Sequence, residues 1–170
     1  MNLEPDFRDF VDLLNKHDVE YMVVGGYALA FHGEPRFTGD LDIWIDCTET
    51  NADKMVAVMK DFGAASLGFT KKDFMDEGII KQIGQPPLRI DILGDIDGVR
   101  YSDAVTDKQY FQSGKLTIPF IGVKDFIKNK EAVGRKKDLE DVRKVQKVRP
   151  KLIEKNLRKK TQGKKKGKRL

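Results

Sequence analysis

The chain has 170 residues, 39% hydrophobic and 35% charged, which predicts one highly charged globular domain with room for a core. No stretch approaches the roughly 18 apolar residues that a membrane span needs. The acidic N-terminus lacks the charged-then-apolar order of a signal peptide, and the single cysteine, Cys47, excludes an intrachain disulfide. These features predict a cytoplasmic protein without a membrane partner.

The net charge of +5 is unevenly distributed along the chain. Residues 149–170 contain eleven Lys or Arg and one Glu, a balance of +10, so residues 1–148 carry −5. We therefore expect a mildly acidic domain at 1–148 and a basic, low-complexity, disordered tail at 149–170. Two interpretations of the tail stay open: a solvated charge run, or a segment that contacts RNA or DNA phosphates without sequence preference.

Hydrophobic periodicity and turn residues divide the domain into alternating helices and strands. In chain order we expect a helix at 5–14, a strand at 21–24, a short helix at 27–32, a strand at 41–45, a helix at 50–62, strands at 79–83, 88–93 and 115–121, and helices at 123–133 and 136–148. This order implies an α/β (α+β) domain in which helices flank a small mixed sheet.

Three details of these elements are also predicted. Thr50 and Asp53 have the spacing of a capping box at the start of the third helix. Pro119 indicates that its strand ends there or lies at a sheet edge. In the last helix, an inward face is expected for three residues: Leu139, Val142 and Val145.

The stretch GEPRFTGDLDIWID, residues 33–46, begins a strand with two aspartates on one face. Because strand side chains alternate, Asp40 and Asp42 share a face, whereas Leu41 and Ile43 point into the core. Two carboxylates so close repel each other unless one stays protonated or a cation lies between them. A hard divalent ion such as Mg²⁺ suits such a pair, particularly with substrate phosphates as further ligands.

A later strand, LRIDIL, supplies a third acid. Asp91 is flanked by two isoleucines, and an acid in that position is costly unless it is paired or ligates a metal. We interpret Asp91 as the third ligand, with an ion pair to Arg89 or a lysine as the alternative. Asp46 lies too far along the first strand to join the site, and Asp95 and Asp97 are interpreted as solvated loop acids.

Gly25 and Gly26 separate the strand at 21–24 from the short helix that follows. Glycine tolerates a positive φ and lets backbone N–H groups approach an anion, and a helix N-terminus favours phosphate. A plain turn explains the pair equally well when it is judged alone. The position of the pair shortly before Asp40 favours a phosphate site.

Together, VVGGYALAFHGEPRFTGDLDIWID, the isolated RIDIL and the late element KNKEAVGRKKDLEDV resemble the nucleotidyltransferase (polymerase β-like) superfamily. The resemblance is closest to small prokaryotic members near the AbiEii-type toxins and the minimal nucleotidyltransferases, and it covers roughly residues 20–145. It implies the nucleotidyltransferase fold and transfer of NMP from an NTP such as ATP to a hydroxyl acceptor. Where the family usually has Ser or Thr after the second glycine, this chain has Tyr27.

The resemblance also implies roles for individual residues. Asp40, Asp42 and Asp91 would be catalytic and would hold two Mg²⁺ ions, with Mn²⁺ as an alternative. The residues implied in nucleotide binding are Gly25, Gly26, Arg36, Thr38, Lys130 and Arg135. Thr38 is expected to order its loop by hydrogen bonding. Asp138 and Asp141 of the late element are interpreted as ordinary partners of helix charges.

Three functions remain open from the sequence. The first is a toxin-like nucleotidyltransferase with an antitoxin partner, acting on RNA, tRNA or protein. The second is an antibiotic-modifying nucleotidyltransferase, whose cationic drug substrates an acidic surface would suit. The third is a nucleic-acid-binding protein with a vestigial site, for which the tail would be essential and the acids would not.

Overall fold

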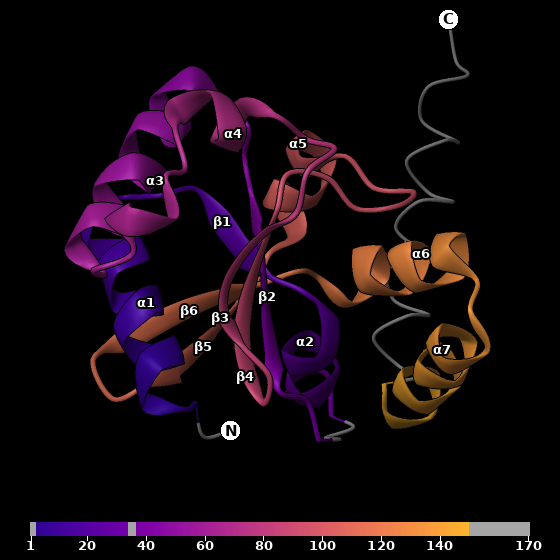
Figure 1. Cartoon of the computed structure of the whole chain (residues 1–170). Coiled ribbons are helices and arrows are strands. Elements are labelled where there is room, and N and C mark those ends of the chain that lie inside the picture. The colour runs from indigo at the N-terminus through magenta and orange to yellow at the C-terminus, as the bar shows by residue number, and fades with distance from the viewer. Residues whose placement is uncertain (1–2, 34–36, 150–170) are drawn as a thin grey trace, which may run out of the picture.

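Six strands form one mixed sheet in the order β3-β4-β2-β1-β6-β5 in the computed structural model, which describes residues 3–33 and 37–149 (Figure 1). The predicted α/β class, a small mixed sheet flanked by helices, is confirmed. Arg36 and the tail from residue 150 onward lie outside the described residues. The division into a domain and a basic tail therefore stays a prediction.

The strands alternate with helices along most of the chain. The strands are β1 (Tyr21–Val23), β2 (Asp40–Ile45), β3 (Lys81–Gln85), β4 (Leu88–Leu93), β5 (Gln109–Ser113) and β6 (Leu116–Phe120). The helices are α1 (Pro5–Lys16), α2 (Gly25–Phe31), α3 (Glu49–Asp61), α4 (Lys71–Met75), α5 (Tyr101–Ala104), α6 (Val123–Val133) and α7 (Lys136–Val148), with short 3₁₀ turns η1 (Ala65–Leu67) and η2 (Val105–Asp107). None of the helices in the described part of the chain is long and apolar enough to cross a membrane.

The register between β2 and β4 positions the acidic residues. The two strands run parallel, with Asp40 opposite Arg89 and Asp42 opposite Asp91. β1 pairs antiparallel with the other side of β2, so β2 lies in the middle of the sheet. Because directly paired residues of neighbouring strands point to the same face, Asp42 and Asp91 lie side by side.

The sheet edge at β5 was not predicted, and its presence changes the interpretation of Pro119. β5 pairs along its whole length with β6, so Pro119 does not lie at a sheet edge, but β6 does end one residue later, at Phe120, close to the strand end that was the other alternative. On its other side β6 meets β1 only at Phe120, followed by a hydrogen bond from the N–H of Ile121 to the carbonyl of Val23. Pro119 has no N–H to donate, and none is needed on the β1 side because β1 does not pair with β6 at that position.

Helix ends follow local capping chemistry, and only some of these ends were predicted correctly from the sequence. α6 ends at Val133, as predicted, and Gly134 with φ +69° is its C-cap. The capping box expected at Thr50 is wrong, because α3 begins at Glu49 and Thr48 is the N-cap, accepting from the N–H of Asn51. The short helix α4, which was not predicted, begins where the Asp73 carboxylate accepts hydrogen bonds from Thr70.

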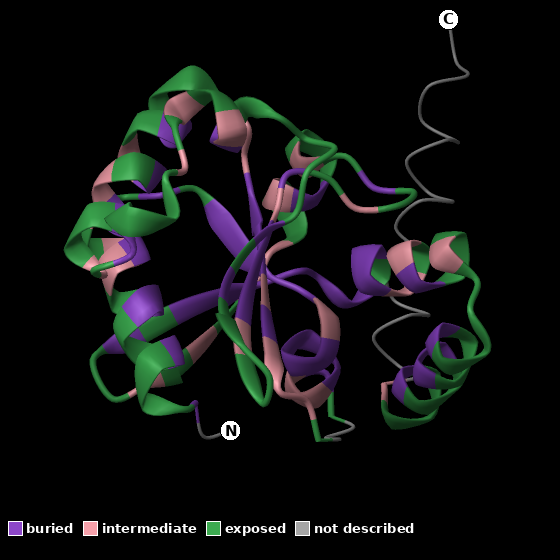
Figure 2. Ribbon diagram, viewed as in Figure 1, coloured by how far each residue is buried: buried purple, intermediate pink, exposed green. Residues whose placement is uncertain are grey.

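The core fills the space between the sheet and the flanking helices (Figure 2). The apolar face predicted for α1 is buried, from Phe7 to Leu14. In α7, Val142 and Val145 are buried, but Leu139 is 37% exposed, so its predicted inward position is wrong. Leu139 lies in the first turn of α7, where the buried position belongs instead to the charged residue Asp138.

A buried histidine connects three elements that surround the candidate site. His32 is the C-cap of α2, and its ring Nε2 donates to the carbonyl of Ile121, between β6 and α6. The ring also packs 5.5 Å from the ring of Phe126 in α6. Arg149, after the end of α7, donates to the carbonyls of His32 and Phe31. α2, the start of α6 and the end of α7 are thus held at one point.

This environment predicts a pH dependence of stability. Burial, with a smaller contribution from Arg149, lowers the pKa of His32 to about 4, although the hydrogen bond to Ile121 opposes the shift. The unfolded state therefore binds a proton at higher pH than the folded state, and stability falls as the pH drops from about 6.5 to 4. The unfolding free energy is expected to fall by about 3 kcal/mol over this pH range because of His32.

Urea denaturation at several pH values would measure this contribution. The difference in unfolding free energy between the wild type and His32→Gln is expected to shrink between pH 7 and pH 4, since glutamine does not titrate. His17→Gln is the control, because His17 is partly exposed and pairs with Asp61 at the surface. A wild-type to His32→Gln difference that stays constant with pH would contradict the assignment.

Candidate active site

Three carboxylates converge where β2 and β4 run side by side. Asp40 and Asp42 alternate with the fully buried Leu41 and Ile43, as the strand pattern predicted. Asp91, on β4, is only 7% exposed. The structure therefore brings the acid from the later strand to the predicted pair, although about fifty residues separate them along the chain.

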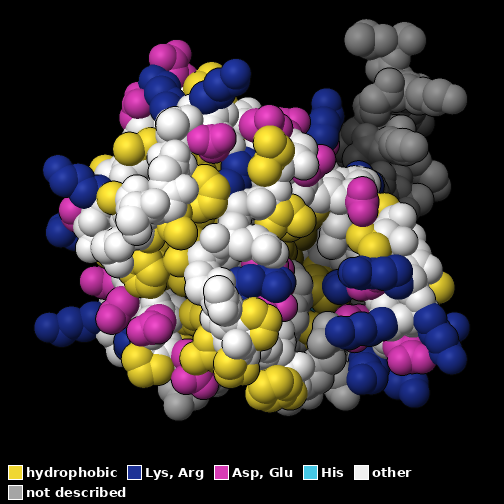
Figure 3. All heavy atoms as spheres, viewed as in Figure 1, with side chains coloured by type: hydrophobic (Ala, Val, Ile, Leu, Met, Phe, Trp, Pro, Cys, Tyr) yellow, Lys and Arg dark blue, Asp and Glu magenta, His cyan; other side chains and the backbone are white. Residues whose placement is uncertain are grey.

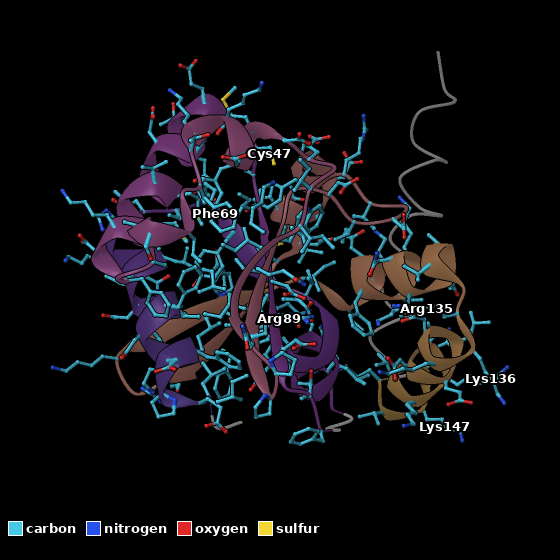
Figure 4. The ribbon with its side chains drawn as sticks, in the orientation of Figure 1. Cys47, Phe69, Arg89, Arg135, Lys136 and Lys147 are labelled. Atoms are coloured by element: carbon cyan, nitrogen blue, oxygen red, sulfur yellow. The ribbon has the colours of Figure 1, made fainter. Side chains whose placement is uncertain are left out.

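Arg89 holds two of these acids. Its Nε and Nη2 donate to the two oxygens of Asp91 at 2.7 and 2.8 Å, and Nη2 also lies 3.3 Å from Oδ2 of Asp40. In Figure 4, Arg89 lies at the centre of the molecule, close to the strands that carry the acids. The ion pair considered from the sequence is therefore present, and it orders the cluster by a bidentate contact. The Asp91 carboxylate in turn raises the pKa of Arg89.

Asp42 is the acid whose environment is least favourable to negative charge. Burial raises the pKa of Asp42 to about 6, and the charges of Asp91 and Asp40 add to the shift. A hydrogen bond from the backbone of Gly26 and the positive charge of Lys130 act in the opposite direction. A cation beside Asp42 would relieve the repulsion that remains.

Gly25 and Gly26 form the surface against which this cluster rests. The predicted turn is the first turn of α2 itself, which begins at Gly25 with φ +60°. A Cβ at Gly25 would overlap Oδ2 of Asp42, and a Cβ at Gly26 would lie 2.8 Å from Oγ1 of Thr38. The two glycines are therefore required for close approach of the backbone to the acids and to the Thr38 loop.

A pocket of about 490 Å³ opens in front of Asp40 and Asp42. Its walls come from the start of α2 and the Thr38 loop, from β4 and the loop after it, and from the junction of α6 and α7. The charged residues that line it are Asp40, Asp42, Asp95, Asp97, Lys130, Arg135 and Lys137. Gly25, Gly26 and Thr38 line it as well, so Asp40, Asp42 and most of the predicted nucleotide-binding residues share one cavity, whereas Asp91 does not line it.

Lys130 and Arg135, the basic residues of the late element, form ion pairs with acids of α7 and also line the pocket. Lys130 is 7% exposed, with its Nζ 2.6 Å from Asp138 and 3.6 Å from Asp141. Arg135 donates to the second oxygen of Asp138 at 2.6 Å. The expected helix ion pairs are present, yet Lys130 and Arg135 also line the pocket. Arg135 lies where α6 and α7 meet in Figure 4, and other Lys and Arg side chains gather over α7 in Figure 3.

The sequence missed three charged residues of this pocket. Asp95 and Asp97 are solvent-exposed, as expected of loop acids, but their loop packs toward α6 and they line the cavity. Lys137 also lines it, and it had been noted only as part of the late motif. The position of Lys137 within the late motif is the only sequence signal that could have placed it in the pocket. Asp95 and Asp97 reach the pocket through tertiary packing, which no local sequence pattern shows.

Two further predicted positions have defined environments. Thr38 orders its own loop, since its Oγ1 donates to the carbonyl of Asp40. Tyr27, which replaces the family's Ser or Thr, is 8% exposed and packs edge-on against Phe7 at 5.9 Å. Its side chain therefore belongs to the core and does not take the place of the family's hydroxyl beside a phosphate.

The carboxylate oxygens of Asp40, Asp42 and Asp91 are the groups that could bind a divalent ion here. Within residues 3–33 and 37–149, no group of three or more His, Cys, Asp or Glu side chains is arranged to hold a metal as it stands. Arg89 already occupies both oxygens of Asp91 and reaches Asp40. The oxygen-only chemistry and the raised pKa of Asp42 nevertheless fit a hard cation.

The fold and the set of acids behind a Gly-Gly turn define a nucleotidyltransferase-type protein. Over residues 4–166 the chain matches the family described as nucleotidyl transferase of unknown function (DUF2204), and it belongs to that family. The family description gives nucleotidyl transfer as its class of reaction, with a nucleotide as substrate. No curated protein sequence matches the chain.

Two solved structures share the fold. One is a candidate nucleotidyltransferase from Thermotoga maritima (TM1012), with a TM-score of 0.53 and 17% identity over 84% of this chain and 91% of that one. The other is an antigenic nucleotidyltransferase-like protein from Paracoccidioides brasiliensis, with a TM-score of 0.53 and 14% identity over 85% of this chain and 74% of that one.

The contact between Gly25 and Asp42 predicts the effect of an added methyl group. Gly25→Ala is expected to lower the melting temperature by roughly 5 °C more than Gly68→Ala. Both glycines have a positive φ, so alanine costs about 1–2 kcal/mol of backbone strain at either position. At Gly68 a Cβ meets nothing within 4 Å, whereas at Gly25 it displaces a carboxylate. Equal losses for the two variants would contradict the close contact.

The ion pair of Arg89 predicts a coupling with Asp91. Arg89→Leu is expected to lower the melting temperature by roughly 5 °C, because it leaves a buried carboxylate without its partner. Adding Asp91→Asn should recover part of that loss. Arg100→Leu is the control, since its ion pair with Asp103 is exposed and should contribute little. Additive effects of the Arg89 and Asp91 changes would show that the pair is not coupled.

Proposed function

We propose that this protein transfers a nucleoside monophosphate from an NTP to a hydroxyl acceptor, with Asp40, Asp42 and Asp91 as its catalytic acids. The observation that supports this most strongly is the convergence of these acids in register across β2 and β4, where Asp40 and Asp42 line a pocket and Asp91 lies buried beside Asp42. Lys130, Arg135 and Lys137 make another wall of this pocket basic. The family to which the chain belongs is described as nucleotidyl transferase. The close packing of Gly25 against the half-buried carboxylate of Asp42 favours an intact site over a vestigial one.

The residues that would hold Mg²⁺ are Asp40 and Asp42, with Asp91 as the third ligand, and we propose two ions. Bound there, Mg²⁺ would neutralise phosphate charge and activate the attacking oxygen. Arg89 contacts both Asp91 and Asp40, so these two carboxylates are held in place before substrate arrives.

The chemical step needs a proton acceptor and a route for the leaving group. The acceptor hydroxyl oxygen forms a bond to the α-phosphorus, and the bond from that phosphorus to the bridging oxygen of the β-phosphate breaks. Pyrophosphate leaves with the bonding electrons, and Asp91 takes the hydroxyl proton. The bidentate contact with Arg89 fixes the orientation of the Asp91 carboxylate for that transfer.

The remaining pocket residues would bind the triphosphate. The backbone at Gly25 and Gly26 approaches from one side, and Lys130, Arg135 and Lys137 supply positive charge from the other. Arg36 was expected to contribute as well, but it lies outside the described residues.

We propose RNA, with tRNA foremost, as the acceptor. A basic tail of local charge +10 beside an acidic domain suits a polynucleotide better than a cationic drug. A protein acceptor and a toxin role with an antitoxin partner remain part of this proposal on family likeness alone. A cytoplasmic location remains part of it on the sequence features alone.

Label transfer tests the proposal. Purified protein incubated with α-³²P-labelled NTPs, Mg²⁺ and pooled tRNA is expected to label the RNA. Asp42→Asn should lower the rate by about 1,000-fold, which corresponds to roughly 4 kcal/mol of transition-state stabilisation. If tRNA takes no label, total cellular protein replaces it as the acceptor pool.

Asp46→Asn is the matched control. Asp46 directly follows the same strand and loses the same charge, but it does not line the pocket. Its rate should stay within about twofold of the wild type. Undiminished transfer by Asp42→Asn would show that the acids are not catalytic.

A further inference from the structure

The loop after β4 forms one end of the pocket and is fixed in place on α6. The side-chain Nδ2 of Asn129 donates to the backbone carbonyl of Asp97 at 3.0 Å. At Gly98 a Cβ would lie 2.6 Å from the Cβ of Ala132, so the loop and the helix are in close contact. The loop is therefore a formed wall of the pocket.

The polar side chains at this end all carry hydrogen-bond acceptors. Asn129 uses one of its two Nδ2 hydrogens on Asp97, so its Oδ1 can accept from a ligand and the second hydrogen stays available. Asp95 and Asp97 add two exposed carboxylates, and neither makes an ion pair within the described ranges. The cations that line the pocket come instead from the junction of α6 and α7. We call Asp95, Asp97 and Asn129 the acceptor end.

Apolar side chains line the same cavity. They are Ile80, Leu93, Ile96 and Val133, and Ile80 is 54% exposed. Ile96 lies between the two acids of the acceptor end, and Val133 lies one helical turn after Asn129. A flat apolar ligand with donors on its edge would cover these side chains and satisfy the acceptors at once.

We infer that the acceptor end binds the base of the NTP and selects guanine. This inference rests on the proposed function, because it places the triphosphate at the acids and the base at the other end of their pocket. Guanine presents two adjacent donors, N1–H and the 2-amino group, which match the two oxygens of one carboxylate. Adenine and cytosine offer an amino group beside an acceptor nitrogen, and uracil offers one N–H between two carbonyls. None of these three satisfies a carboxylate at both oxygens.

Calorimetric titration of the whole chain with GTP, ATP, CTP and UTP, each with Mg²⁺, tests the inference. GTP is expected to bind at least about tenfold more tightly than ATP, CTP or UTP. One bidentate contact to a base edge provides discrimination of that size. Equal affinity for all four would overturn the inference and leave the proposed function standing. Binding of none would overturn both.

Two isosteric variants identify the carboxylate. Asp95→Asn and Asp97→Asn are tested singly with GTP and with xanthosine triphosphate, whose base carries a carbonyl in place of the 2-amino group. At the base-reading position, the asparagine NH₂ donates to that carbonyl while its oxygen still accepts from N1–H. One variant is therefore expected to lose about tenfold in affinity for GTP and to gain as much for xanthosine triphosphate.

Asp103→Asn is the control, because it removes the same charge from α5 outside the pocket. It should bind GTP as the wild type does and ignore xanthosine triphosphate. If neither pocket variant changes the preference between the two nucleotides, the acceptor end does not read the base. The gain of a new ligand distinguishes base recognition from a general loss of folding or charge.

Discussion

The parallel pairing of β2 with β4 sets Asp42 directly opposite Asp91, with Asp40 two residues away, and this repulsive arrangement governs the rest of the site. Three neighbouring acids are tolerated because Arg89 binds Asp91 and Asp40, while the backbone of Gly26 and the charge of Lys130 act on Asp42. The same crowding explains the glycine at position 25, since a methyl group there would overlap Asp42. A cluster so costly to hold together is typical of a functional site.

The helices at the end of the chain take part in this electrostatic balance. Lys130 is buried against Asp138 and Asp141 of α7, yet its charge still lowers the pKa of Asp42. The docking of α7 therefore fixes the position of a cation that acts on Asp42. At the other end of α7, Arg149 binds the C-terminus of α2, the helix that begins with the glycines. The acidic floor and the basic wall of the pocket are thus parts of one packed unit.

Much of this site could be predicted from the sequence, because its key residues obey local rules. The period of two in a strand placed Asp40 and Asp42 on one face, and the isoleucines around Asp91 marked an acid in a buried strand. The acceptor end had no such signal, since Asp95 and Asp97 follow a strand among glycines and gain their position only from packing on α6. Edge strand β5 was missed because its polar, half-exposed sequence has little apolar alternation.

A structure of the protein with Mg²⁺ and a non-hydrolysable NTP analogue would test the central claim most directly. The account predicts metal ions on the carboxylates of Asp40, Asp42 and Asp91, with the α-phosphate above them and the triphosphate between Gly25–Gly26 and the basic wall. Arg89 should keep its contact with Asp91. A nucleotide bound elsewhere, or metal ions that leave these three carboxylates untouched, would contradict it.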